Sequence, residues 1–143
     1  LNSSVIGDPK QPEVRLPGTG GGNDISSLTQ MIVAIKHEKR RFVEKVDFVT
    51  SPGYLSGKST RQDAGLISGG MYRVVTDLGI LGFDEKSKSM KVKALHPGVT
   101  IEEIRDNTGF DLLIDEDLKL TNAPTDEELR VLRHLDPDQV YIA

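Results

Sequence analysis

Short apolar segments recur along the 143-residue chain, and their spacing predicts strands separated by turns and helices. Residues 31–35 form an uninterrupted apolar run, which is typical of a strand buried on both faces. Residues 90–94 alternate apolar and lysine side chains, which indicates a half-exposed strand. This strand is expected to form a hairpin with residues 80–83 through the polar residues 84–89. Further strands are predicted at residues 14–16, 46–50, 71–76 and 111–114.

Two helices are predicted in the C-terminal third, where a threonine is followed three residues later by a glutamate. Residues 100–103 and 125–128 both match the capping box, in which the threonine hydroxyl and the glutamate carboxylate satisfy free backbone N–H groups. The first helix is expected to end near Gly109 and the second before Pro137. Strands interleaved with helices predict a single α/β domain over residues 1–143, with a mostly parallel sheet flanked by helices.

Two segments have the composition of irregular chain. Residues 1–12 hold Gly7, Pro9 and Pro12 among polar neighbours and are expected to be an irregular lead-in. Residues 51–70 contain five glycines, four serines and one proline with little periodicity. A stretch of this length inside a compact domain predicts a long loop that is either flexible or part of an active site.

Composition narrows the classes of function. The 22 acidic side chains outnumber the 18 basic ones, and the resulting net charge of −4 disfavours a nucleic-acid partner. The absence of cysteine excludes a disulfide, a thiolate nucleophile and a cysteine-ligated metal. No apolar run reaches the length of a membrane span and residues 1–10 do not resemble a signal peptide, so a cytoplasmic protein without a membrane partner is expected. The chain opens on Leu1 rather than methionine, which suggests that part of the protein lies upstream.

A glycine-rich segment is the strongest candidate for chemistry. Gly18 and Gly20 follow a predicted strand and precede a short helix, expected to be capped by Asn23 or Asp24 and to run to Met31. The spacing is close to the dinucleotide-binding fingerprint, but Asn23 stands where the third glycine is needed. The backbone N–H groups of such a segment can hold a phosphate or a developing oxyanion. A plain tight turn explains the same glycines equally well.

The remaining candidates are weaker. Residues 57–59 resemble the end of a phosphate-binding P-loop, but Pro52 occupies the position of its first glycine. His37, at the end of a predicted strand, is the histidine that has some chance of contacting a ligand, whereas His96 is expected in a turn and His134 on a helix surface. No two histidines have a metal-ligand spacing, so no metal is expected. An exposed strand edge is the preferred explanation for the lysines at 86, 88, 91 and 93, with contact to an anionic partner as the alternative. Residues 115–117 are expected to form an ordinary charged turn.

Several segments together resemble coenzyme A transferase family I, and within it the β subunit of the glutaconate CoA-transferase type. They occur in the order found in that family and span nearly the whole chain. The first is Leu-Pro-Gly-Thr-Gly-Gly-Gly-Asn-Asp at residues 16–24. The others are at residues 36–43, 46–53, 72–79, 96–100 and 125–130.

The resemblance implies a CoA-transferase-like topology and a reaction in which coenzyme A passes from an acyl-CoA to a free carboxylic acid through a glutamyl-CoA thioester. It implies that Gly20, Gly21 and Gly22 form the oxyanion hole for the thioester carbonyl. Coenzyme A is then a substrate, with no metal and no prosthetic group, and an α subunit is the protein partner. The residues expected to contact the acyl-CoA or support its site are Gly18, Thr19, Asn23, Asp24 and Tyr54.

The chain departs from the family at the nucleophile. The nucleophilic glutamate of the family precedes Asn-Gly or Ser-Gly, and none of the nine glutamates here does so. The chain is therefore expected to be the C-terminal portion of a β subunit, inactive on its own, that forms a hetero-oligomer or, as a fragment, a homodimer. Two alternatives stay open. One is the β subunit of a hydrolase that opens rings on CoA esters without a covalent thioester, and the other is a non-catalytic structural portion.

Overall fold

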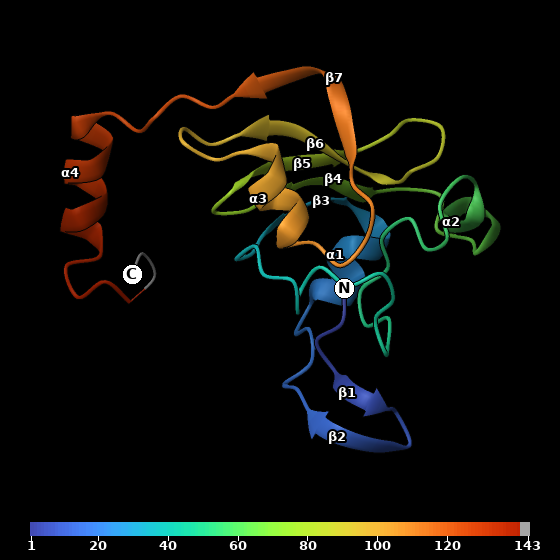
Figure 1. Cartoon of the computed structure of the whole chain (residues 1–143). Helices are drawn as coiled ribbons and strands as arrows, with labels where there is room; N and C mark the ends of the chain where they lie inside the picture. Colours follow the sequence, from blue (N-terminus) through green and yellow to red (C-terminus); the bar gives the residue numbers. More distant parts are fainter. Residues whose placement is uncertain (141–143) are drawn as a thin grey trace.

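A five-stranded sheet forms the centre of the computed structural model, which describes residues 1–140 (Figure 1). The strand order is β3-β4-β5-β6-β7. The two outer pairings, β3 with β4 and β6 with β7, are parallel, whereas β5 is antiparallel to both of its neighbours. The strands are β3 (Gln30–Ala34), β4 (Gly70–Val75), β5 (Gly79–Phe83), β6 (Met90–Leu95) and β7 (Leu113–Leu120). The α/β class is confirmed with a mixed sheet, and the predicted hairpin of residues 80–83 with 90–94 is present as β5 and β6.

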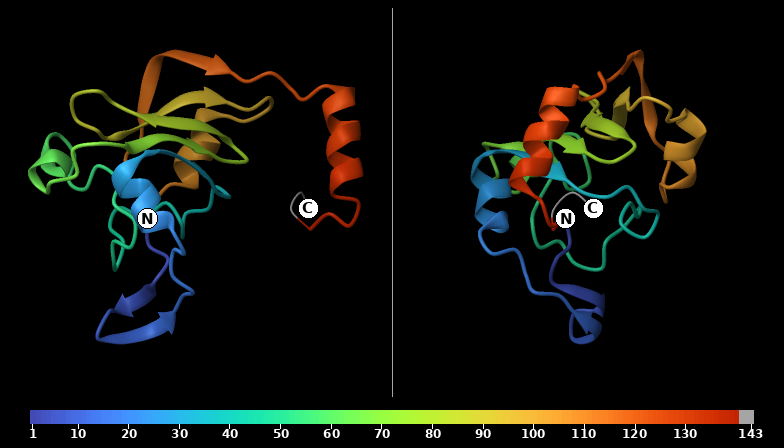
Figure 2. Two further views of the ribbon diagram at one scale, coloured as in Figure 1. Left: turned by 180° about the vertical axis from the view of Figure 1, so that it is seen from behind. Right: turned by 90° about the vertical axis from the view of Figure 1, so that its left-hand side faces the viewer.

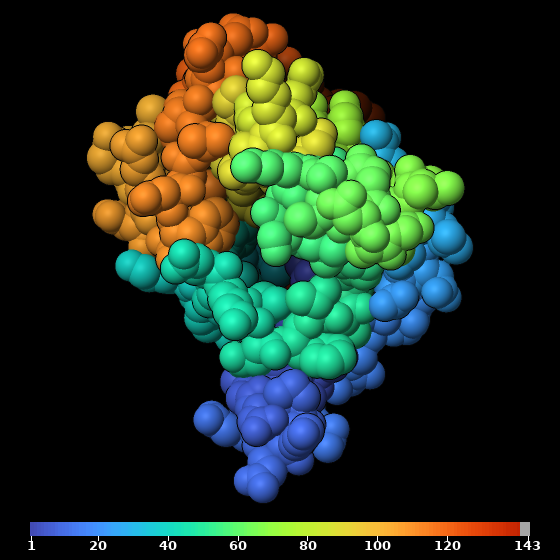
Figure 3. All heavy atoms as spheres, turned by 90° about the vertical axis from the view of Figure 1, so that its right-hand side faces the viewer, coloured from blue at the N-terminus to red at the C-terminus, as the bar shows by residue number. Residues whose placement is uncertain are grey.

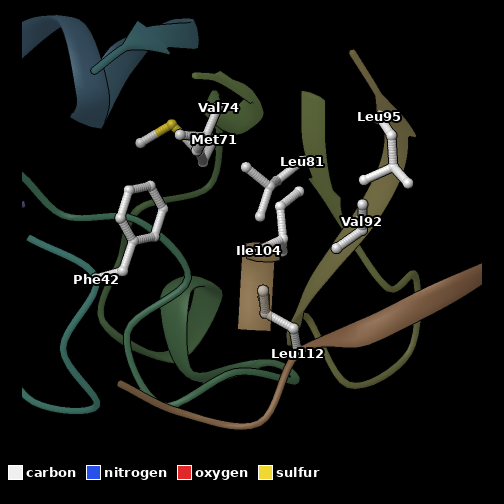
Figure 4. Close-up of a cluster of buried hydrophobic side chains, with 8 residues drawn as sticks. All are labelled: Phe42, Met71, Val74, Leu81, Val92, Leu95, Ile104 and Leu112. Atoms are coloured by element: carbon white, nitrogen blue, oxygen red, sulfur yellow. The ribbon is translucent and has the colours of Figure 1, made fainter. Parts of the chain in front are cut away.

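One face of the sheet carries the hydrophobic core. Ile104, from helix α3 (Ile101–Asp106), packs against Leu81 and Val92 of the sheet, and all three are fully buried (Figure 4). Phe42 and Leu112 enclose the cluster from the segments that precede β4 and β7. Burial of apolar area at about 25 cal/mol per Å² makes this cluster the main source of stability. The other members are Met71, Val74 and Leu95.

Both predicted helix starts are confirmed. The Thr100 hydroxyl accepts a hydrogen bond from Glu103 N at the start of α3. At the start of α4 (Asp126–Leu135) the capping box is complete, because the Glu128 carboxylate also accepts from Thr125 N at 2.8 Å. Each cap satisfies N–H groups that a helix terminus otherwise leaves free.

Helix α4 lies apart from the sheet at the end of an extended connection (Figures 1 and 2). None of its residues is buried, and Leu132 and Leu135 are 41% and 74% exposed. The helix therefore presents an apolar face that nothing in the described part of the chain covers.

The prediction of an irregular lead-in over residues 1–12 is wrong. Strands β1 (Val5–Asp8) and β2 (Gln11–Arg15) form a separate antiparallel hairpin that projects from the rest of the molecule (Figure 1). Gly7, at φ +85°, lies at a register shift, and Pro9 stands in the turn between the strands. Gly7 thus occupies a bulge and Pro9 a turn, and both positions are compatible with a hairpin.

Three further details differ from the prediction. Residues 46–50 form no strand. Strand β3, at the edge of the sheet, is not buried on both faces: exposed and half-buried residues alternate along it, and Ile32 is 61% exposed. Residues 115–117 lie within β7 rather than in a turn.

The lysines of β6 have a different role from the predicted one. Strand β6 is an inner strand, and Lys91 and Lys93 form ion pairs with Asp115 of the neighbouring β7. The hydrogen bond from Lys93 lowers the pKa of the Asp115 carboxyl. These two lysines therefore join adjacent strands, and the exposed-edge explanation is wrong for them.

Candidate functional site

The glycine-rich segment forms a loop between β2 and helix α1 (Gly22–Leu28). Gly18 and Gly20 have φ values of +89° and +59°, which side chains with a Cβ rarely adopt. Open space lies beside Gly18, Gly20 and Gly21, because a Cβ placed on any of them would meet no atom within 4 Å. The backbone of this loop can therefore be approached closely by a ligand.

Two N–H groups in the loop are available for such a ligand. Gly22 N donates to Thr19 O at 3.0 Å, so this predicted oxyanion donor is already engaged. Gly20 N and Gly21 N have no hydrogen-bond partner within residues 1–140. Free backbone N–H groups of this kind are the donors from which oxyanion holes are built.

Asn23 and Asp24 do not cap α1 as predicted. Gly21 occupies the N-cap position, and no side chain caps the helix. The Asn23 side-chain amide instead donates to Thr50 O at 2.7 Å, and Asp24 lies in the first turn of the helix. Asn23 therefore joins the glycine loop to the residues that open the long segment 51–70.

The long segment is more ordered than its composition suggests. It contains the short helix α2 (Thr60–Asp63) and the buried side chain of Arg61, which donates to carbonyl groups on both ends of the segment. A lone arginine in a glycine- and serine-rich stretch carries no pattern that sequence reasoning could have detected. Arg61 is the residue of this region that the prediction missed.

Tyr54 lies in the wall of a cavity of about 450 Å³ rather than projecting into solvent. Its hydroxyl donates to Met71 O at 2.9 Å. Its ring packs edge-on against the Phe83 ring, with the ring centroids 5.0 Å apart. The proton of the Tyr54 hydroxyl is therefore engaged, and Lys88 Nζ lies over the ring at 5.3 Å from its centroid. The other walls are mainly apolar and include Val33 and Phe42.

The cavity and the glycine loop are neighbouring but separate features. The residues that line the cavity include Val49, Gly53 and Tyr54 but none of the five residues 18–22. The segment 50–53 links them, since Thr50 accepts from Asn23 and Ser51 Oγ lies near Gly22. Figure 3 shows a hollow on one face of the molecule, framed by teal and green parts of the chain.

Two of the three histidines, His37 and His96, make structural contacts. His37 is 3% exposed, stacks on Phe42 with a ring separation of 4.0 Å, and lies within hydrogen-bond distance of the Thr76 and Thr108 hydroxyls. Burial lowers the pKa of His37. The suggestion that it contacts a ligand is wrong in this structure. His96 bridges Thr121 Oγ1 and Thr76 O, and His134 lies on exposed α4 as predicted.

Among residues 1–140, no group of three or more histidine, aspartate or glutamate side chains could hold a metal ion. In the same part of the chain, no helix has the length and apolar character of a membrane span.

The sequence and structure of this chain are similar to those of known proteins. The family model described as Coenzyme A transferase matches residues 1–107. The chain is 42% identical over 144 residues to a glutaconate CoA-transferase subunit of Acidaminococcus fermentans, covering 99% of this chain and 54% of that protein. The crystal structure of glutaconate coenzyme A-transferase from that organism superposes with a TM-score of 0.92 at 41% identity, covering 100% of this chain and 55% of that chain.

Two further relatives differ in named activity. The chain is 41% identical to a 3-oxoadipate CoA-transferase subunit of Pseudomonas knackmussii, over 95% of this chain and 53% of that protein. It is 36% identical to the cholesterol ring-cleaving hydrolase IpdB subunit of Rhodococcus jostii, over 95% of this chain and 54% of that protein. The chain thus spans about half the length of the relatives it matches. The resemblance and the CoA-transferase-like fold are confirmed, and the chain belongs to the coenzyme A transferase family.

Proposed function

We propose that this chain forms part of an enzyme that moves coenzyme A between an acyl-CoA and a free carboxylic acid. The observation that carries the proposal is the free pair of N–H groups at Gly20 and Gly21, in a chain 42% identical to a CoA-transferase subunit. The nucleophilic glutamate of the glutamyl-CoA thioester would lie outside these 143 residues, because no glutamate here precedes Asn-Gly or Ser-Gly. Acyl-CoA is then a substrate, and the chain by itself would be inactive.

The proposed role of the loop is electrostatic. Attack on the thioester carbonyl places negative charge on its oxygen, and N–H groups aimed at that oxygen stabilise the charge. Gly20 and Gly21 would donate to the oxyanion, and Gly22 would hold the loop through Thr19. Gly18, Thr19, Asn23 and Asp24 would support the loop, and the Tyr54 ring would contact the substrate. A C-terminal place within a β subunit, an α-subunit partner and a cytoplasmic location remain predictions, supported for the partner by relatives named as subunits.

The test uses the assembled enzyme, with this chain in its complete subunit and with its partner. The enzyme is incubated with an acyl-CoA and a free carboxylic acid, and mass spectrometry identifies the CoA esters and the protein masses. A new CoA ester together with a CoA adduct on the subunit is the expected result. No turnover with any ester would contradict the proposal.

A matched pair of variants tests the N–H donors directly. Gly21→Pro removes the free N–H but also restricts the preceding Gly20, whose φ is +59°, so the turnover of this variant is measured only in protein that folds and assembles like the wild type. Gly21→Ala keeps the N–H and places its Cβ in open space. Loss of one oxyanion donor is expected to lower kcat by about 10²–10³-fold in Gly21→Pro. Gly21→Ala is expected to stay within a few-fold of the wild type. If neither variant changes turnover, the portion has a structural role instead.

The second candidate is a CoA-ester ring-opening hydrolase. It is favoured by the 36% identity to a hydrolase subunit and by the lack of the glutamate motif in these residues. Incorporation of ¹⁸O from labelled water into the product, without a CoA adduct on the protein, would select this reaction over CoA transfer.

A further inference from the structure

Arg61 carries a full positive charge into the interior of the molecule without a negative partner. The residue is 3% exposed, and no carboxylate in the described part of the chain lies within ion-pair distance of it. A buried charge is costly unless polar groups replace its water. Here backbone carbonyl groups replace the water around the two terminal nitrogens, whereas Nε has no hydrogen-bond partner among residues 1–140.

The guanidinium joins three parts of the chain that are distant in sequence. One terminal nitrogen donates to Gly53 O at 2.9 Å, and the other donates to Ser26 O at 2.7 Å and to Ser68 O at 2.8 Å. The remaining bonds go to Pro52 O and Ser27 O. Arg61 thus ties both ends of the long segment 51–70 to the last turn of α1, whose carbonyls lack partners within the helix.

Segment 50–53 is consequently fixed against α1 at two points. Asn23 holds Thr50 beside the first turn of the helix, and Arg61 holds Pro52 and Gly53 beside the last turn. At its start the glycine loop is held by Gly18 N, which donates to Ser3 O at 2.8 Å, whereas no atoms crowd Gly20 or Gly21. The positions of Gly20 and Gly21, which immediately precede α1, therefore depend on how α1 is held.

From this arrangement we propose that Arg61 is a positioning residue for the reaction. It sets α1 and segment 50–53 in one arrangement, and so places the Gly20 and Gly21 N–H groups relative to the substrate contact at Tyr54. The proposal rests on the function proposed above. Arg61 itself is too deeply buried to touch the substrate, so its effect passes through the loop.

Lysine cannot replace this side chain. It keeps the positive charge, but its single ammonium group lacks the planar fork that reaches carbonyls on three segments. A displacement of about 1 Å at a reacting group can cost about 10²-fold in rate. We therefore expect Arg61→Lys to lower kcat by about 10–100-fold with little change in KM for the acyl-CoA, because the misplaced donors act on the transition state.

The experiment measures kcat and KM per folded site in the assembled enzyme. Arg61→Lys is compared with Arg15→Lys, the same exchange at an exposed position of the β1–β2 hairpin, which is expected to leave both constants unchanged. Arg61→Ala provides a second test, by chemical rescue. Guanidinium at millimolar concentration is expected to occupy the space left by the side chain and to restore part of the turnover of this variant. Ammonium at the same concentration is expected to restore none.

The outcomes separate this proposal from the proposed function. If the wild-type assembly itself shows no turnover, the proposed function fails. If the wild type turns over and folded Arg61→Lys keeps its kcat, only the positioning role fails. A lower yield of folded protein with unchanged kcat per site would likewise assign Arg61 to stability alone.

Discussion

His37 occupies a place in the core that an uncharged side chain would normally take. It packs flat on Phe42, its ring nitrogens face the hydroxyls of Thr76 and Thr108, and Asp77 accepts from its backbone N–H. Burial lowers the pKa of His37, although the nearby Asp77 charge opposes this shift. The neutral ring is therefore the form that the folded state favours.

This arrangement predicts a loss of stability in mild acid. Because the pKa is lower in the folded than in the unfolded state, the unfolded chain binds more protons, and stability falls as the pH drops below about 6.5. Thermal unfolding between about pH 7.5 and about pH 5.5 should show a steeper fall in Tm for the wild type than for His37→Gln. His134→Gln, on the exposed helix, should keep the wild-type slope. Equal slopes for all three proteins would refute the assignment.

Alanine substitutions at Gly69 and Gly65 form a matched pair that tests the cost of a Cβ at a positive φ. Both have positive φ values, +69° and +81°, but a Cβ on Gly69 would overlap the carbonyl group of Thr29, whereas a Cβ on Gly65 would meet open space. Gly65→Ala should cost about 1–2 kcal/mol from the left-handed conformation alone. Gly69→Ala should cost more, because the overlap is with backbone. Urea unfolding curves measure both, and similar losses would show that the approach to Thr29 relaxes easily.

The sequence identified the glycine loop, but it did not identify the hydrogen-bond partners of the residues in that loop. The glycines at 18 and 20 were detectable because positive φ values exclude most other residues. The engagement of Gly22 with Thr19, and of Asn23 with Thr50, depends on contacts made after folding. Arg61 was undetectable because its partners are carbonyl groups, which every residue type possesses.

Elements whose signals are local were predicted well. The β5–β6 hairpin and the starts of α3 and α4 follow from patterns that lie within a few residues of one another. Elements that depend on distant partners were predicted poorly. Residues 46–50 have the composition of a strand but no neighbouring strand to pair with, and the ends of β7 depend on its register with β6.

Helix α4 should respond strongly to its cap because tertiary packing does little to hold it. Thr125→Ala removes both threonine hydroxyl contacts of the capping box and should cost about 1 kcal/mol of local stability. Hydrogen exchange should accelerate in residues 126–135 while the sheet strands keep their protection. Thr125→Ser should restore the wild-type pattern. Faster exchange throughout the sheet would mean that α4 and the sheet unfold together.

On the scale of the whole molecule, the apolar face of α4 is exposed in a chain about half as long as its relatives. Exposed apolar faces of this kind promote association. The 143-residue chain alone should therefore self-associate at micromolar concentration, and Leu132→Glu should shift it towards monomer in sedimentation velocity. Arg133→Glu makes the charge of the same helix more negative by two units without removing an apolar side chain, and serves as the control. A monomeric wild type would contradict this prediction.

The β1–β2 hairpin has a practical use. Its turn at Pro9 and Lys10 projects from the body of the molecule, on the far side from the sheet (Figure 1). Short insertions are tolerated best at exposed turns of this kind. A fluorophore or affinity peptide placed there would report on binding and assembly while leaving the glycine loop, Arg61 and the cavity wall undisturbed.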